Sequence, residues 1–357
     1  MTEIQKKLID EEQINKQVSC TQNKTKEVQE RIKKLTYHRD FVPYNLSQTQ
    51  EGTLSEKLLL ELLDSFSDGM LRDCSHLPMK EKIYCMFLYI HYGFSSRRLI
   101  SELKIAKERG LIKKIVHFNS VLNYFGTESM TNILKKLIYI TSLPLKNIEE
   151  HTLIDSSGFS TSEFMRWIDI RTQKPEIRRK WKKVHLVIGA KSQTICAIEI
   201  SNGSENDSPF LVPLISKVRK SFDLKAVSAD SAYLSRGNLN FIASLGAVPY
   251  IKFKSNSIRN AKGSVIWTAL YDFYLNNRIK WDEGYHVRSL IESANSSIKR
   301  KYGSNLKTKK DVSQVNEILM KCLCYNLSVL INCAFEMGLN IDLLTCKEEY
   351  ESMENKL

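Results

Sequence analysis

From residue 151 onward, short β-rich runs and helical runs alternate in an order that few folds accommodate. Three strand-like runs come first, at 151–159, 184–190 and 194–200, and the last two are separated only by Lys-Ser-Gln, which is typical of a β-hairpin. A helical run at 208–222, a strand at 225–230, a helical run at 234–246 and a strand at 247–253 follow. This order predicts a mixed α/β sheet flanked by helices rather than a sandwich or a barrel.

The region before the strands is helical in pattern. The expected helices lie at 55–66, 78–92, 95–110 and 119–142, with breaks at Gly93 and Gly110. Pro43, Gly52 and a polar stretch should separate the first of them from a charged segment, so we expect that helix to start near Ser55. Ser95 or Ser96 can cap the third helix.

Arg97 and Arg98 begin the third of these helices, and short helices joined by tight turns match a helix-turn-helix whose basic end meets DNA. A plain helical bundle fits the same pattern.

The helical and strand-like runs divide the chain into four units: a charged helical or linker segment at 1–50, an all-α and DNA-binding region at 51–148, an α/β domain at 149–338 and an acidic tail at 339–357.

The charge balance favours a polyanionic partner. The chain has 357 residues with 53 Lys and Arg against 40 Asp and Glu, a formal net charge of +13, which points first to nucleic acid and second to an anionic membrane surface. The N-terminus is charged where a secretory signal would be apolar, and the last long helical stretch, 311–335, is interrupted by polar residues. We therefore expect a soluble, cytoplasmic protein with no membrane span.

The eight cysteines are scattered, mostly among apolar residues, and form no C-x-x-C pair. We interpret them as reduced core thiols, with a metal site as the alternative.

Two aspartates follow predicted strands. Asp155 closes the first strand and precedes Ser156, Ser157 and Gly158, while Asp230 ends the strand at 225–230. Strand ends are where α/β sheets place their sites, although aspartate also forms turns there through its own backbone. Paired carboxylates repel each other and are tolerated mainly around a divalent cation, and their hard oxygens select Mg²⁺ or Mn²⁺.

The segment 285–303 combines acidic, basic and aromatic residues at helical spacing. At about 100° per residue, one arc of roughly 60° carries Tyr285, Arg288, Glu292 and Lys299. The opposite side carries the aliphatic residues Val287, Leu290, Ile291, Ala294 and Ile298. Such a helix packs on its aliphatic stripe and presents the other four together, but a solvated helix face would look the same.

The spacing Y-x2-R-x3-E-x6-K of these four residues resembles the signature around the final glutamate of DDE transposases encoded by bacterial and archaeal insertion sequences. LIDSSGF around Asp155 and ADSAY around Asp230 resemble the surroundings of that family's two aspartates, and the strand order is similar to its ribonuclease-H-like fold. The resemblance covers about residues 150–335, and weakly 55–145.

This resemblance implies that Asp155, Asp230 and Glu292 are catalytic and hold two Mg²⁺ or Mn²⁺ ions, with Asp155 bridging both. Tyr285, Arg288 and Lys299 would contact phosphates beside the scissile bond. One departure is the short stretch 255–284, where some relatives carry a long β-rich insertion. Trp267 and Trp281 lie in it, and we interpret them as core residues rather than as platforms for a flipped base.

Basic residues flank the candidate site in sequence. Residues 171–191 hold eight Lys or Arg and one Glu, with Trp181 among them, and residues 278–310 hold nine against three acidic residues. A solubilising hairpin edge is the alternative to DNA contact. The residues expected to bind DNA, besides Tyr285, Arg288 and Lys299, are Arg300, Lys301, Arg178, Arg179, Lys180, Lys182, Lys183, Arg97 and Arg98.

The resulting hypothesis is a nucleoid-associated DNA transposase. It would cleave and transfer strands at the terminal inverted repeats of an insertion sequence, with magnesium and as a homodimer on double-stranded end and target DNA. Two alternatives stay open: a non-catalytic DNA-binding relative, and a ribonuclease-H-like nuclease without strand transfer.

Overall fold

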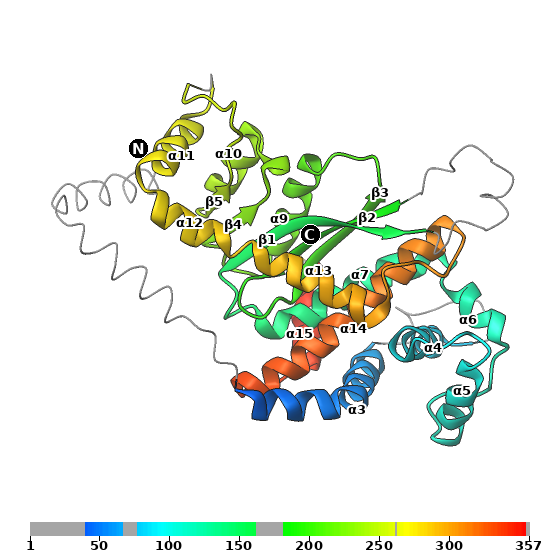
Figure 1. The fold of residues 1–357 in the computed structure, drawn as a ribbon. Coiled ribbons are helices and arrows are strands. Elements are labelled where there is room, and N and C mark those ends of the chain that lie inside the picture. Colours follow the sequence, from blue (N-terminus) through cyan, green and yellow to red (C-terminus); the bar gives the residue numbers. More distant parts are fainter. Residues whose placement is uncertain (1–39, 67–76, 162–180, 261–262, 355–357) are drawn as a thin grey trace, which may run out of the picture.

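A five-stranded mixed sheet forms the centre of the computed structural model, which describes residues 40–66, 77–161, 181–260 and 263–354 (Figure 1). The strand order is β3-β2-β1-β4-β5, with β1–β2 and β2–β3 antiparallel and β1–β4 and β4–β5 parallel. The strands are β1 (His151–Ser160), β2 (Trp181–Gly189), β3 (Ile195–Asn202), β4 (Ala226–Ala229) and β5 (Val248–Ile251).

Helices flank the sheet, as the sequence predicts. The connection from β3 to β4 contains α9 (Leu211–Arg219), and the one from β4 to β5 contains α10 (Arg236–Ser244). After β5 come α11 (Val265–Asn276), α12 (Arg278–His286), α13 (Ser289–Tyr302), α14 (Asp311–Met337) and α15 (Leu343–Glu354). The mixed α/β fold with this order of elements is therefore confirmed.

A helical region precedes the sheet. It contains α3 (Phe41–Ser65), α4 (Met79–Tyr92), α5 (Leu99–Glu108), α6 (Phe118–Tyr124) and α7 (Glu128–Ser142). Gly93 and Gly110 end helices with φ of 66° and 75°, a conformation that favours glycine, so both predicted breaks are confirmed. Whether these helices form a separate DNA-binding domain stays a prediction, as does the division into four units.

The expectation that the first described helix starts near Ser55 is wrong, because α3 begins at Phe41. Asp40 caps it through a hydrogen bond from the Val42 amide at 3.0 Å, and Pro43 lies in the first turn, where its missing N–H is not needed. The polar residues that suggested a linker are satisfied by tertiary contacts: Ser47 is buried and donates to Asn332 of α14 at 2.7 Å.

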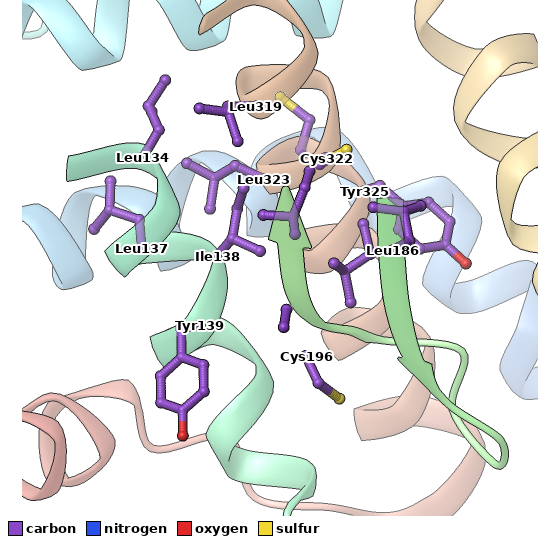
Figure 2. Close-up of a cluster of buried hydrophobic side chains, with 14 of the residues drawn as sticks. Leu134, Leu137, Ile138, Tyr139, Leu186, Cys196, Leu319, Cys322, Leu323 and Tyr325 are labelled. Atoms are coloured by element: carbon purple, nitrogen blue, oxygen red, sulfur yellow. The ribbon is translucent and has the colours of Figure 1, made fainter. Parts of the chain in front are cut away.

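Helix α14 is the centre of the hydrophobic core, and α3 and α7 both pack along it. It is long and apolar enough to span a membrane by composition, but 83% of its most apolar window is buried inside the protein, as befits a core helix. Figure 2 shows Leu134 and Ile138 of α7 facing Leu319 and Leu323 of α14. The polar residues Asn316, Glu317, Lys321 and Asn326 of α14 are buried with partners.

Six cysteines lie in the described residues, and all six are free and buried: Cys85, Cys196, Cys322, Cys324, Cys333 and Cys346. The interpretation as core thiols holds for these, while Cys20 and Cys74 lie outside the described residues.

Candidate active site

Asp155 and Asp230 lie side by side at the carboxyl end of β4. Ile154 of β1 pairs in parallel with Ala229 of β4, and each aspartate is the next residue of its chain. Asp155 does not close its strand as expected, because β1 continues to Ser160 and stays paired with β2 along that length. Strand β1 stops pairing with β4 after Ile154 but continues to pair with β2. The two aspartates still follow directly on the last paired residues of β1 and β4, so their carboxylates are adjacent.

The third carboxylate, Glu292, lies in the first turn of α13, which contacts β1 (Figure 1). Arg288 connects it to the sheet. The Arg288 Nη2 donates to Glu292 Oε1 at 2.6 Å, and its Nη1 lies 3.5 Å from Asp155 Oδ2. One guanidinium thus joins two of the three candidate catalytic carboxylates.

The four signature residues do not lie on one continuous helix, contrary to the expectation. Helix α12 ends at His286, and a tight turn follows in which the Arg288 amide donates to Tyr285 O at 3.0 Å and the Ile291 amide to Arg288 O at 3.1 Å. The turn still keeps Tyr285 beside Arg288, whose guanidinium carbon lies 5.9 Å from the ring centroid.

The turn arises because α12 is fastened to the parallel strands while α13 packs on β1. Ser228 of β4 donates to the Gly284 carbonyl at 2.9 Å. A Cβ on Gly284 would lie 2.4 Å from the Tyr250 ring of β5, so only glycine permits this approach. Trp281 is fully buried against the same Tyr250 ring.

Lys299 lies about two turns after Glu292 along α13 and points at β1. Its Nζ donates to Ser157 Oγ at 2.7 Å and lies 5.5 Å from the centroid of the Phe159 ring. Burial lowers the pKa of Lys299. The lysine is therefore held against β1, at Ser157, which lies two residues after Asp155 in the same strand.

The Asp155 carboxyl lies in surroundings that disfavour its charged form. Burial is the main reason that the pKa of Asp155 is raised to about 6, and the neighbouring charges of Asp230 and Glu292 raise it further. The Ser156 amide and the Arg288 guanidinium oppose this shift. The charged form of Asp155 would therefore be favoured by a further positive charge beside it.

A cleft of about 510 Å³ opens between β1 and α13. Asp155, Glu292, Lys299 and Arg300 line it. The rest of the lining consists of small polar residues that the sequence reasoning did not single out as site residues: Ser156, Ser157, Asn295, Ser296 and Ser304. Ser156 and Ser157 could have been expected at the site from the sequence, because they directly follow Asp155.

Some residues expected to bind DNA are engaged elsewhere. Lys182 is buried and forms hydrogen bonds with Asp311 and Asn202. Lys183 pairs with Asp207 at 2.8 Å on the sheet face opposite to Asp155, since neighbouring strand positions alternate between faces. Lys301 is paired with Glu51 of α3 at 2.5 Å.

Two further basic candidates, Arg97 and Arg98, do not line the cleft. Arg97 and Arg98 are exposed just before α5, and the Arg97 guanidinium carbon lies 4.8 Å from the Phe118 ring centroid. Arg178, Arg179 and Lys180 lie outside the described residues.

The tryptophans behave largely as expected. Trp281 is a core residue, and Trp267 packs edge-on against Phe253 and donates its Nε1–H to Ile258 O at 2.9 Å. Trp181, at the start of β2, is 44% exposed.

Within the part of the chain that the structure describes, no three His, Cys, Asp or Glu side chains form a group arranged to hold a metal ion. Arg288 lies between Asp155 and Glu292 and provides the positive charge there. The donor chemistry nevertheless fits a divalent cation, because Asp155 of β1, Asp230 after β4 and Glu292 of α13 would supply the hard carboxylate oxygens that such ions prefer.

The chain matches a protein-family model over the region that contains this site. The model of the transposase DDE domain matches residues 146–327, more than half of the chain, and this span contains the sheet, the cleft and all three carboxylates. Domains of this kind generally use divalent metal ions. The chain therefore belongs to the transposase DDE domain family and is related to the enzymes of DNA transposition and recombination.

Proposed function

We propose that the protein is a transposase that cleaves DNA at the terminal inverted repeats of an insertion sequence and joins the freed ends to target DNA. The observation that carries this proposal is the adjacency of Asp155 and Asp230, with Arg288 linking Asp155 to Glu292 across the cleft. Asp155, Asp230 and Glu292 are the proposed catalytic residues and the proposed ligands of two Mg²⁺ or Mn²⁺ ions.

The proposed reaction consists of two displacements at phosphorus. Water first attacks the scissile phosphodiester, and the bond between phosphorus and the 3′-oxygen breaks to leave a 3′-hydroxyl and a 5′-phosphate. That hydroxyl then attacks a target phosphodiester and displaces its 3′-oxygen. When bound, the divalent ions would supply Lewis-acid stabilisation of the charge that develops on the phosphoryl oxygens.

The chain's own basic residues have distinct parts in this scheme. Arg288 presents a planar fork that suits two phosphate oxygens, and it can exchange its carboxylate partners for the backbone of the scissile strand. Lys299 and Arg300 line the same cleft and would hold the neighbouring phosphates. Tyr285 lies against Arg288 and limits the positions that the guanidinium can take.

The small polar side chains of the cleft suit a DNA strand better than a small apolar substrate. Ser156, Ser157, Ser296 and Ser304 bring hydroxyl groups, which donate to phosphate and sugar oxygens without reading base sequence. Sequence recognition would then come from elsewhere in the chain, and we assign it to the helical region that contains Arg97 and Arg98. The homodimer on DNA and the association with the nucleoid belong to the same proposal.

The test is a strand-joining assay on the protein with magnesium and DNA that carries the inverted repeats flanking its gene. A transposase cleaves uncut ends and joins pre-cut ends to a second duplex. Cleavage without joining would identify a nuclease that lacks strand transfer. Specific binding with neither reaction would identify a non-catalytic relative.

A further inference from the structure

Helix α5 packs on the protein along one face. Its buried residues, Leu99, Leu103 and Ala106, fall within an arc of about 60° at 100° per residue. The helix packs on α4, and Figure 1 shows it projecting beyond α4 at the lower right of the molecule, away from the sheet. The face opposite to the buried residues is therefore turned to solvent.

The outward face of α5 carries three side chains of different chemistry. Lys104, Ile105 and Glu108 are all exposed, and they fall within an arc of about 100° centred opposite the buried residues. Lys104 and Glu108 have the four-residue spacing at which helical ion pairs form. Neither is paired with a charged side chain of the residues that the structure describes. A free cation, an apolar side chain and a free carboxylate thus lie together on one helix face.

These three kinds of side chain match the groups that base pairs present in the major groove. An ammonium group donates to O6 and N7 of guanine, a carboxylate accepts from the N4 amino group of cytosine, and an apolar side chain contacts the thymine methyl group. The major groove is about 12 Å wide, which accommodates a helix of about 10–12 Å diameter. The outward face of α5 is thus suited to contact base edges.

Basic residues lie on both sides of this face along the chain. Arg98 precedes the helix, and Lys113 and Lys114 follow it, and all three are exposed. No carboxylate within the described ranges pairs with any of them. Phosphates border the major groove on both sides, so cations at these positions can hold the DNA backbone while the face between them meets the bases.

The segment that follows α5 is fixed by the protein. Ile112 and Val116 are buried, and the Lys113 amide donates to Glu81 Oε2 of α4 at 2.9 Å. Lys113 and Lys114 are consequently presented from an anchored backbone. Such anchoring reduces the conformational entropy that is lost when the two lysines contact phosphate.

The first turn of α5 is engaged within the protein. The Arg97 guanidinium carbon lies 4.8 Å from the Phe118 ring centroid, and the Ser101 hydroxyl donates to Arg98 O at 2.7 Å. These contacts occupy the side chains that a helix would otherwise present from its basic start. The side chains left to contact bases are those in the middle and at the end of the outward face.

We propose that α5 lies in the major groove of duplex DNA and reads base edges with Lys104, Ile105 and Glu108, while Lys113 and Lys114 contact backbone phosphates. The inference rests on the proposed function for its partner and deepens it by naming the residues that recognise the terminal repeats. Glu108 also rejects wrong sequences, because guanine and thymine present acceptor atoms that repel a carboxylate. Sequence preference and general affinity for DNA are then carried by different residues.

The test uses two double variants of the full chain, with binding measured in EDTA so that the result does not depend on catalysis. The reading variant, Lys104→Gln with Glu108→Gln, removes two base-contacting groups without changing the net charge. The phosphate variant, Lys113→Gln with Lys114→Gln, removes two positive charges.

Each variant has a matched control elsewhere on the surface. Lys57→Gln with Glu61→Gln removes an exposed lysine and an exposed glutamate that are four residues apart on α3. Lys57→Gln with Lys225→Gln removes two exposed lysines. Circular dichroism and thermal midpoints establish that all four variants are folded.

Binding is compared between a fluorescent duplex that carries the inverted repeat and a duplex of the same composition in scrambled order. In the reading variant, the preference for the repeat should fall by roughly 5- to 150-fold, with an unchanged slope of log K against log salt. In the phosphate variant, that slope should fall by about two units, at roughly 0.9 per phosphate contact, with an unchanged preference. The controls should keep both properties.

A reading variant that keeps the full preference for the repeat would overturn the assignment of base reading to α5, and so would a natural protein without any preference. Equal salt slopes in the phosphate variant and the natural protein would overturn the phosphate contacts. Because cleavage is not measured here, failure of the proposed catalytic function would appear separately, in the strand-joining assay.

Selection from a library of random duplexes tests Glu108 by itself. Glu108→Gln should replace a cytosine preference by an adenine preference at one position of the selected sequence, because glutamine pairs with N6 and N7 of adenine. An unchanged selected sequence would overturn the part assigned to Glu108.

Discussion

Arg288 and Glu292 form an ion pair across the first turn of α13, with the Arg288 Nη2 2.6 Å from Glu292 Oε1, and the same guanidinium reaches toward Asp155. The pair links the helix that carries the third carboxylate to the strand that carries the first. It also places a cation between Asp155 and Glu292, two of the three proposed metal ligands.

Replacing Arg288 by lysine should lower the rate of DNA cleavage by about 10- to 100-fold, since a single ammonium cannot join two carboxylates or hold two phosphate oxygens, and a charged hydrogen bond contributes about 1.5–3 kcal/mol. The matched control is Arg300→Lys, in the same cleft but without an ion pair to the carboxylates. Equal losses in both variants would show that Arg288 acts only as one more basic residue.

Asp155 should make the fold less stable as the pH rises. Its folded-state pKa of about 6 lies above the ordinary aspartate pKa of 3.8, so its contribution to stability is complete below pH 4 and is lost as the pH rises through 6. Asp155→Asn should therefore raise the free energy of unfolding at pH 7 by about 2–3 kcal/mol in EDTA and change it little at pH 4. Urea unfolding at several pH values measures this; a variant less stable at pH 7 would contradict the shift.

Magnesium should stabilise the protein through the same carboxylates. A ligand that binds only the folded state at 100 times its Kd stabilises it by about 2.7 kcal/mol. The thermal midpoint should rise with Mg²⁺ or Mn²⁺ in the natural protein and not in Asp155→Asn or Asp230→Asn. A rise of the same size in both variants would place the ion elsewhere.

The loop after α13 depends on a buried ion pair of α14. Lys321 and Glu317 are 3.2 Å apart and almost fully buried. Lys321 donates to Gly303 O at 3.0 Å and to Asn305 O at 2.9 Å, while Glu317 accepts from the Thr308 amide at 2.9 Å. This loop in turn pairs with the end of β1 through Ser160.

Lys321→Met should lower the free energy of unfolding by about 3–5 kcal/mol, because it leaves the Glu317 carboxylate buried without its partner. Lys309→Met, an exposed change in the same neighbourhood, should have little effect. Equal stability of the two variants in urea would show that the buried pair does not hold the loop.

The sequence was sufficient for the features that local pattern determines. The alternation of strands and helices predicted the sheet, and the local pattern singled out Asp155 and Asp230, which come directly after the residues that pair β1 with β4. The sequence was not sufficient where contacts between distant segments determine the bounds of a strand or helix. The length of β1 depends on pairing with β2, and the early start of α3 depends on Asn332, 285 positions from Ser47.

The same limit applies to the signature of Tyr285, Arg288, Glu292 and Lys299 and to the basic residues expected to bind DNA. Helical spacing contains neither the turn that follows α12 nor the close packing of Gly284 on Tyr250 that precedes it. Lys182 and Lys301 carry charges that look available in sequence, yet their partners Asp311 and Glu51 come from distant segments. Charge counts therefore predicted a DNA-binding protein without identifying which lysines face DNA.

The most direct test of the catalytic assignment measures cleavage and binding together on inverted-repeat DNA with magnesium, for Glu292→Gln and for the control Glu283→Gln, an exposed residue of α12. The account predicts that Glu292→Gln binds the DNA as tightly as the natural protein but does not cut it, while Glu283→Gln does both. Cleavage by Glu292→Gln at the natural rate would contradict it.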